Sequence, residues 1–156
     1  MSSELTIKEA KERAGRFCAF RERSPKEVFE KVKSWGISTL ESEKMVADLV
    51  ALNYVNEQRF ANAFCHDKFE FNSWGKQKIR LAIYAHNIPS DVVDLALERI
   101  GVKYEERLRE LAKRKWTKLS SEETRKRKQK TANYLANKGF EAGLIWKTIA
   151  LLDKSQ

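Results

Sequence analysis

The sequence contains few residues that interrupt helices, with only six glycines and two prolines among 156 positions. Average usage of these two residues together is ~12% of a chain, and here it is about half of that or less. Proteins built from many short strands need both residues at their frequent turns. The scarcity of glycine and proline therefore predicts a helical protein.

Residues suited to catalysis or metal binding are scarce as well. Two cysteines, Cys18 and Cys65, cannot build a disulfide scaffold, so we expect a reducing, cytoplasmic environment. With His66 and His86 they do not supply the three or four convergent ligands of a metal site. The sequence patterns of phosphate-binding loops, dinucleotide sites, CxxC motifs and zinc proteases do not occur. We expect no metal, no cofactor and no enzymatic activity.

The individual histidines and cysteines have simpler interpretations. Cys18 and Cys65 occupy matching positions in two apolar stripes, which favours small buried residues. His86 stands at the end of a predicted helix, where packing or capping explains it. His66 and Asp67 are neighbours in a predicted helix and diverge by ~100°, so we expect no hydrogen bond between them.

Long apolar runs are missing too. No stretch approaches the ~18 uncharged residues of a membrane span, and the opening Met1–Thr6 shows no basic segment followed by an apolar one. We expect neither a membrane partner nor a secretory leader. Apolar residues nevertheless make up 42% of the chain, which is enough for a folded core.

Apolar residues recur with helical spacing between clear start and stop signals. The starts are capping-box pairs, namely Thr6 with Glu9, Ser24 with Glu27, Ser38 with Glu41, and Ser120 with Glu123. The stops are Gly36, Asn87, Gly101 and Gly139. The pattern predicts nine helices, at about 6–22, 25–35, 40–53, 56–71, 75–86, 90–100, 103–117, 121–138 and 141–153. We expect the aromatic residues on or near the stripes to be core: Phe17, Tyr54, Phe60, Phe64, Phe69 and Phe71.

The stripes and stops repeat along the chain. Phe17-Cys18, Phe64-Cys65 and Leu111-Ala112 lie 47 residues apart each time, and the stops at Gly36, Asn87 and Gly139 lie 51 and 52 apart. The sequence therefore predicts an all-α fold, a tandem array of three three-helix repeats that is elongated or curved. The repeats span 1–54, 55–101 and 102–156. A unit of ~50 residues buries little surface alone, so neighbouring repeats should stabilise one another.

The net charge of +9 is concentrated in one segment. Residues 113–130 hold two acids and nine bases: Lys113, Arg114, Lys115, Lys118, Arg125, Lys126, Arg127, Lys128 and Lys130. Bases at the start of a helix oppose its dipole, and like charges four residues apart repel each other. Such a segment is either a solvated charged face or a binding surface for an anionic partner, and we favour binding. Trp116, the one aromatic residue of this segment, is expected to be core or an inter-repeat contact.

Several segments in order resemble the RecX family of recombinase regulators. They are Arg21–Val28, Leu49–Ala61, Gly75–Arg80, Asn87-Ile88-Pro89 with Ala96-Leu97, and Lys138-Gly139-Phe140 with Ile145. The most characteristic part of Leu49–Ala61 is Asn53-Tyr54-Val55-Asn56-Glu57-Gln58-Arg59-Phe60-Ala61. Here Asn53 replaces a glycine, Asn56-Glu57 replaces an acidic pair, and Ala82-Ile83 replaces Glu-Leu. Asn56 is expected to cap the helix that carries Phe60.

The resemblance implies a binding protein, since proteins of this family modulate the RecA recombinase in DNA repair and homologous recombination. The expected partners are the RecA filament and single-stranded DNA, with double-stranded DNA as a further candidate, and the expected state is a monomer. The partner-binding candidates in the middle repeat are Arg59, Lys76, Lys78 and Arg80. The family motif supports Arg59 and Arg80 by position, whereas the bases of 113–130 rest on charge alone. The alternative is a general DNA-binding module that acts through its basic third repeat.

Overall fold

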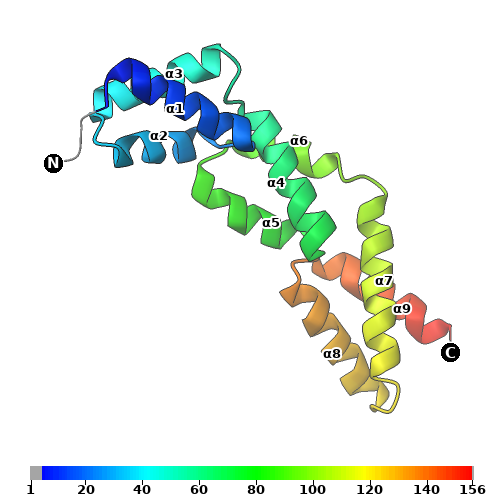
Figure 1. The fold of residues 1–156 in the computed structure, drawn as a ribbon. Coiled ribbons are helices and arrows are strands. Elements are labelled where there is room, and N and C mark those ends of the chain that lie inside the picture. Colours follow the sequence, from blue (N-terminus) through cyan, green and yellow to red (C-terminus); the bar gives the residue numbers. More distant parts are fainter. Residues whose placement is uncertain (1–4, 156) are drawn as a thin grey trace. The chain divides into compact units, whose positions relative to one another are not determined.

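The computed structural model describes residues 5–155, and every regular element in this range is a helix (Figure 1). The elements are α1 (Ile7–Phe20), α2 (Pro25–Ser34), α3 (Thr39–Ala51), α4 (Glu57–Asn72), α5 (Lys76–Ile83), the short 3₁₀ helix η1 (Tyr84–His86), α6 (Ser90–Glu98), α7 (Lys103–Lys118), α8 (Thr124–Asn137) and α9 (Ala142–Lys154). The predicted all-α fold is confirmed. None of the described helices has the length and apolar character that crossing a membrane requires. The ends of the first and third predicted repeats, 1–4 and 156, lie outside the described residues.

The first three helices begin where the sequence predicted. The hydroxyls of Thr6, Ser24 and Ser38 each accept the backbone N–H three residues ahead, at 3.1 Å. Ser24 completes a capping box, because its own N–H donates to the carboxylate of Glu27 at 3.0 Å. Asn56 caps α4 as expected, since its side-chain oxygen accepts the N–H of Arg59 at 2.9 Å.

The predicted capping box at Ser120 is wrong. The chain after α7 makes a turn in which the Ser120 N–H donates to the Thr117 carbonyl at 3.2 Å. Helix α8 then begins at Thr124, and its N-cap, Glu123, makes no side-chain capping bond. Ser120 is drawn into the end of α7, so it is not placed to cap α8. The stops are as predicted, with φ of 87° at Gly36, 56° at Asn87, 62° at Gly101 and 99° at Gly139.

The chain divides into two compact units. Unit 1 consists of Met1–Phe64 with Ile83–Asp94, and unit 2 consists of Cys65–Ala82 with Leu95–Gln156. Residues of the second predicted repeat fall in both units, and the repeat boundaries themselves stay a prediction.

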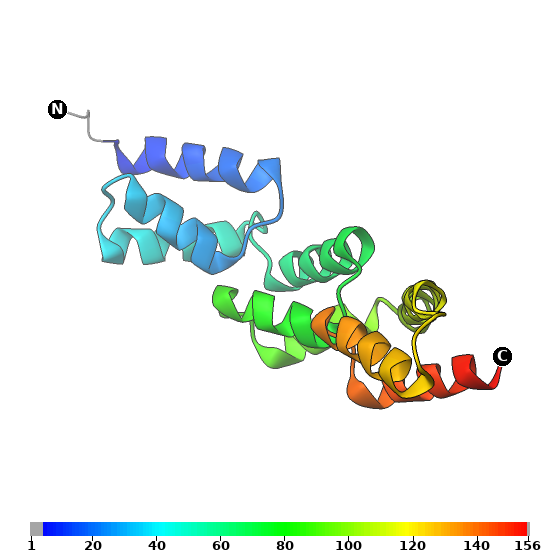
Figure 2. The same ribbon diagram turned by 90° about the horizontal axis from the view of Figure 1, so that it is seen from below.

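Unit 1 is organised around α1, α2 and α3, which pack against one another (Figure 2). Their shared core is apolar and contains Cys18, as expected. Its buried members are Ala10, Ala14, Cys18, Val28, Val32, Ile37, Met45, Leu49 and Val55. Burial of these stripes is the main source of stability for the three helices.

Unit 2 is organised around α7, α8 and α9, which also contact one another pairwise. Their buried residues include Leu108, Leu111, Ala112, Trp116, Leu135, Ile145 and Ile149. Tyr104 joins this core to the start of α5, because its hydroxyl accepts the Lys76 backbone N–H at 2.9 Å and donates to the Glu141 carboxylate. Burial and the bond to Glu141 raise the pKa of Tyr104, so it stays a neutral donor.

Within unit 1, the start of α2 meets the end of η1. The Ser24 hydroxyl lies 3.1 Å from Nδ1 of His86, and the Lys26 ammonium donates to the Ala85 carbonyl at 2.9 Å. The His86 ring packs on Phe60, with centroids 4.8 Å apart, and on Phe64 at 5.5 Å. His86 is therefore a packing residue, as predicted.

Within unit 2, the start of α5 meets the end of α8 in the corresponding place. The Gly75 N–H donates to the Lys138 carbonyl at 2.7 Å, and the Gln77 N–H donates to the Gly139 carbonyl at 3.0 Å. A Cβ on Gly75 would lie 2.3 Å from the Gly139 carbonyl carbon, and a Cβ on Gly139 would lie 2.4 Å from Cβ of Lys78. Both glycines are required for this close backbone approach.

Two aromatic residues predicted as core are exposed. Phe60 and Phe69 are buried as expected, but Phe71 is 77% exposed and Tyr54 is 50% exposed. Phe71 lies in the last turn of α4 and Tyr54 in the loop before it. Helical spacing alone does not show where a neighbouring element stops covering a stripe.

Candidate anion-binding surface

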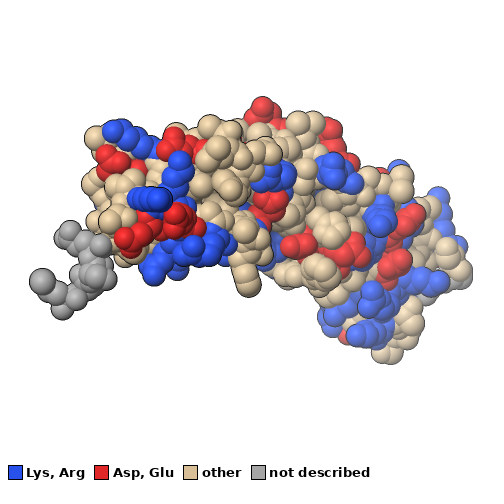
Figure 3. Space-filling model, turned by 45° about the horizontal axis from the view of Figure 1, so that its top comes forward, with Lys and Arg blue, Asp and Glu red and all other residues tan. Residues whose placement is uncertain are grey.

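The basic segment 113–130 occupies the last turns of α7, the following loop and the first two turns of α8. Six of its bases are exposed: Lys113, Arg114, Lys118, Arg125, Lys126 and Lys130. Figure 3 shows Lys and Arg side chains gathered at the lower right of the view, in the part of the molecule formed by unit 2. The first turn of α8 contains no acidic residue. An anion at this helix start would meet both the side-chain charges and the positive end of the helix dipole.

Arg127 differs from its neighbours, because it is only 6% exposed. Its guanidinium lies 3.9 Å from the centroid of the Trp116 ring, and its Nε and one terminal nitrogen donate to the Trp116 carbonyl at 2.9 and 2.7 Å. Trp116 is 3% exposed, which confirms it as core. Arg127 therefore has an internal role, because it ties α8 to the end of α7 by satisfying a terminal carbonyl, and its predicted contact with a partner stays a prediction.

Three further bases of the segment have neighbours within unit 2. Lys128 forms an ion pair with Asp153 at 3.0 Å, and Lys130 pairs with Glu122. The hydrogen bond and charge of Lys130 lower the pKa of Glu122. The Lys115 ammonium lies 5.0 Å from the centroid of the Tyr134 ring. These three bases are engaged by neighbours, although Lys130 is itself exposed, so the other five exposed bases dominate the surface: Lys113, Arg114, Lys118, Arg125 and Lys126.

Arg59, predicted from the family motif, is bound into unit 1. It pairs with Glu22 at 2.9 Å and donates to the Asn53 side chain at 3.1 Å and to the Asn53 carbonyl at 3.0 Å. Its side chain is 39% exposed. Arg59 thus holds together the loops that follow α1 and α3, which gives it a structural task whether or not it touches a partner.

The bases at the start of α5 lie on aromatic rings of unit 2. The Lys76 ammonium is 4.6 Å from the Tyr104 ring centroid, and the Lys78 ammonium is 4.7 Å from that of Trp74. Lys78 also lies 3.5 Å from the Asn137 carbonyl. Both side chains are half-buried, whereas Arg80 is exposed. Among these three bases, Arg80 is the most accessible to a partner.

The histidine prediction needs one correction. Nδ1 of His66 lies 3.2 Å from a carboxylate oxygen of Asp67, although no hydrogen bond was expected between helix neighbours. Both side chains are more than half exposed, so they bend toward each other over the helix surface. The His66 ring also meets that of Phe71 edge-on, with centroids 6.4 Å apart, and among residues 5–155 no cluster of potential metal ligands occurs.

Both cysteines are buried and free, as predicted. Burial raises the pKa of the Cys65 thiol to about 11 and also raises that of Cys18. These thiols are inert packing groups at neutral pH.

Sequence reasoning missed a second basic group, on α1 and α2. Arg13, Arg16, Phe17 and Phe20 lie at i, i+3, i+4 and i+7, so they share one face of α1. Phe17 is part of the apolar stripe and Phe20 stands three residues further on, so the apolar spacing hid the mixture of cations and aromatic rings. The signal was present in the spacing, and Phe20 is 84% exposed.

Comparison with known proteins gives consistent results. A model of the RecX third three-helix domain matches residues 103–149, and one of the second three-helix domain matches residues 56–97. The regulatory protein RecX of Oceanobacillus iheyensis is 23% identical over 141 residues, covering 90% of this chain but only 52% of that protein, so the chain spans about half of its length. The regulatory protein RecX of Prosthecochloris aestuarii is 28% identical over 147 residues, covering 94% and 95% of the two chains.

The fold is also found in a solved structure. The crystal structure of RecX from Lactobacillus salivarius matches with a TM-score of 0.87 at 23% identity, over 94% of this chain and 96% of that one.

Proposed function

Because this chain belongs to the RecX family of regulatory proteins, we propose that it binds the RecA recombinase filament on single-stranded DNA. Binding restrains the filament's ATPase, strand exchange and extension. The match of two RecX domain models, over 56–97 and 103–149, carries the proposal of this partner. We also propose that the protein acts as a monomer in the cytoplasm, without a cofactor.

The exposed bases of the anion-binding surface supply the physical means. Five positive side chains within residues 113–126 face an anionic partner, which is either acidic recombinase surface or DNA phosphate. Contacts of this kind attract by charge and weaken as salt rises, because bound counterions are released. Arg80 is proposed as the contact from the middle of the chain.

The second candidate is a general DNA-binding module. The same five bases would then hold phosphates without reading bases, and any effect on the recombinase would follow from competition for DNA. The concentration of positive charge on α7 and α8 favours this alternative as much as it favours recombinase binding, so the two have to be separated by stoichiometry.

A titration of the protein into RecA ATPase on single-stranded DNA separates them. The regulator predicts inhibition at far less than one protein per DNA binding site. Inhibition that begins only when the DNA is saturated would contradict the regulator and support simple competition.

Charge reversal tests the surface itself. The test variant changes five exposed bases to Glu: Lys113, Arg114, Lys118, Arg125 and Lys126. Its matched control changes five exposed lysines elsewhere: Lys8, Lys33, Lys44, Lys147 and Lys154. We expect the test variant to lose inhibition and the control to retain most of it. Equal losses would mean that net charge, rather than this surface, is responsible.

A further inference from the structure

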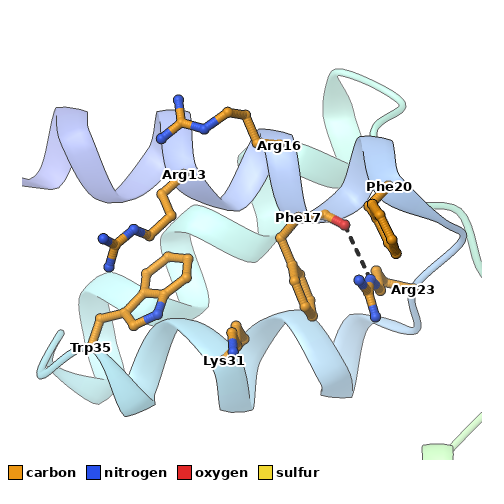
Figure 4. A pocket seen from close by; sticks show the side chains of 7 residues that line it. All are labelled: Arg13, Arg16, Phe17, Phe20, Arg23, Lys31 and Trp35. Carbon is orange, nitrogen blue, oxygen red and sulfur yellow. Dashed lines mark hydrogen bonds between the residues drawn. The ribbon is translucent and has the colours of Figure 1, made fainter.

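A cleft between α1 and α2 of unit 1 combines cations with aromatic rings (Figure 4). Its volume is about 540 Å³, the size class of sites that take a small ligand (~300–1,000 Å³). Four bases line it: Arg13, Arg16, Arg23 and Lys31. None of the described residues that line it is acidic. An unbalanced group of cations in a concave site favours an anionic ligand.

The aromatic lining distinguishes this cleft from an ordinary basic patch. Phe17, Phe20 and Trp35 line it together with the bases. Phe20 leaves 84% of its surface in water, and Figure 4 shows its ring beside Arg23. The core of unit 1 does not use this ring. A large exposed aromatic side chain at the edge of a basic cleft is a surface on which a planar group can stack.

The cations are already placed over aromatic faces. The Arg23 guanidinium lies 3.7 Å from the Phe17 ring centroid and is held there by a 3.1 Å hydrogen bond from Nε to the Phe17 carbonyl. The Arg13 guanidinium lies 5.1 Å from the Trp35 ring centroid, and the Lys31 ammonium lies 5.6 Å from that of Phe17. Such contacts hold the charged groups in place before a ligand arrives, which lowers the entropy lost on binding.

The acids nearest to Arg23 in the sequence are engaged elsewhere. Glu22 pairs with Arg59 at 2.9 Å, and Glu27 pairs with Arg21 at 2.9 Å. Burial and the charge of Arg21 lower the pKa of the Arg23 guanidinium, as expected where positive charge is not fully compensated. These two acids therefore do not form an ion pair with the bases of the cleft.

We infer that this cleft binds single-stranded nucleic acid, with phosphates on its bases and an unpaired nucleobase stacked on Phe20. Single strands expose the faces of their bases, whereas a duplex keeps them stacked, so the aromatic lining favours the single strand. An acidic peptide would meet the charges but would leave the exposed ring without a planar partner. The inference deepens the proposed function by adding a nucleic-acid contact in unit 1, apart from the bases of 113–130.

The test measures binding of the protein alone to a fluorescent oligothymidylate of about 16 nucleotides, without recombinase. Phe20→Ala should weaken binding about 5- to 100-fold with an unchanged salt slope, because a stacking contact is lost and no phosphate contact is. Arg16→Gln should lower the salt slope by about 1. The matched control is Phe71→Ala, which removes a ring that is 77% exposed in unit 2 and should leave affinity unchanged.

Several results would overturn the inference. One is unchanged affinity in Phe20→Ala with the fold intact by circular dichroism. Another is an equal loss for a duplex of the same length, since stacking on a free base would then not be the cause. A third is weaker binding to a recombinase filament or an acidic peptide with unchanged oligonucleotide affinity, which would make the cleft a protein-docking site. The recombinase ATPase titration is separate, so a failed regulatory function and a failed cleft are distinguishable.

Discussion

In unit 1 the start of α2 meets the end of η1 through side chains, whereas in unit 2 the start of α5 meets the end of α8 through the backbone. The places correspond, because Ser24 and Gly75 stand 51 positions apart and Asn87 and Gly139 stand 52 apart. A side-chain junction needs particular chemical groups and leaves room around them. A backbone junction needs no particular side-chain group, but the close approach of the two backbones leaves no room for a Cβ at Gly75 or Gly139.

The basic regions of the two units differ as well. The cleft of unit 1 sets its cations among aromatic rings, with no acid among its described lining residues. The segment 113–130 of unit 2 uses Arg127 as internal support and balances Lys128 and Lys130 with acids. Basic residues that look alike in the sequence thus have three different roles. Some bind a backbone carbonyl inside the unit, some pair with acids, and some form an exposed basic surface. Four predictions test these differences, from the largest expected effect to the smallest.

Gly139→Ala should give the largest loss of stability. The new Cβ would clash with Lys78 and force a φ of 99° on a residue with a side chain, so we expect a loss of about 3 kcal/mol or more in urea unfolding. The control is Gly36→Ala, the corresponding stop in unit 1. It has φ of 87° but nothing within 4 Å of the new Cβ, so only about 1–2 kcal/mol should be lost. Equal losses would show that the backbone approach at α5 does not matter.

Arg127→Met should destabilise unit 2 by about 2–3 kcal/mol, because it leaves the Trp116 carbonyl without two of its donors. Arg125→Met, two residues earlier on the exposed side, should change stability by less than about 0.5 kcal/mol. Thermal unfolding of the two variants measures the difference. An Arg127→Met variant as stable as Arg125→Met would contradict this internal role of Arg127.

Ser24→Ala should cost more than Ser38→Ala. Both remove an N-cap, which costs about 1 kcal/mol. Ser24 also loses its contact with His86, so we expect about 1 kcal/mol in addition. The two variants are compared by urea unfolding under the same conditions. Identical losses would contradict a stabilising junction between α2 and η1.

The smallest effect is alkaline destabilisation through Cys65. Its pKa is about 11 in the folded state against an ordinary 9.0, so its contribution is complete below pH 9 and is lost as pH rises toward 11. At pH 10 the loss should be on the order of 1 kcal/mol. Urea unfolding between pH 8 and 10.5 should show a shallower decline for Cys65→Ala than for the unaltered protein. Parallel declines would contradict the burial of this thiol.

Much of the helical organisation could be predicted from local sequence. The capping residues Thr6, Ser24, Ser38 and Asn56 start helices through bonds that span three residues, so the sequence contains all their partners. Ser120 failed because its turn competes with a capping role, and that competition depends on where α7 ends. The start of a helix depends on residues close in the chain. The role of a residue that two elements can both use depends on where each of them ends.

The candidate sites were harder to predict. The charge of 113–130 is visible in the sequence, yet the burial of Arg127 depends on Trp116, eleven positions away on another helix. The cleft of unit 1 went unnoticed because Phe20 shares the spacing of a core residue, and only the packing of α1 on α2 shows that its ring is uncovered.

By itself the sequence determined the all-α class, the nine α-helices found among residues 5–155, the 47- to 52-residue spacing of the stripes and stops, and the position of the excess charge. These follow from interactions between residues close in the chain and from composition, and the same local patterns carry the resemblance to the RecX family. The tertiary structure alone decided which charged and aromatic side chains are covered. Exposure depends on neighbours from other helices, so identical residues such as Arg125 and Arg127, or Phe20 and Phe60, end in opposite environments.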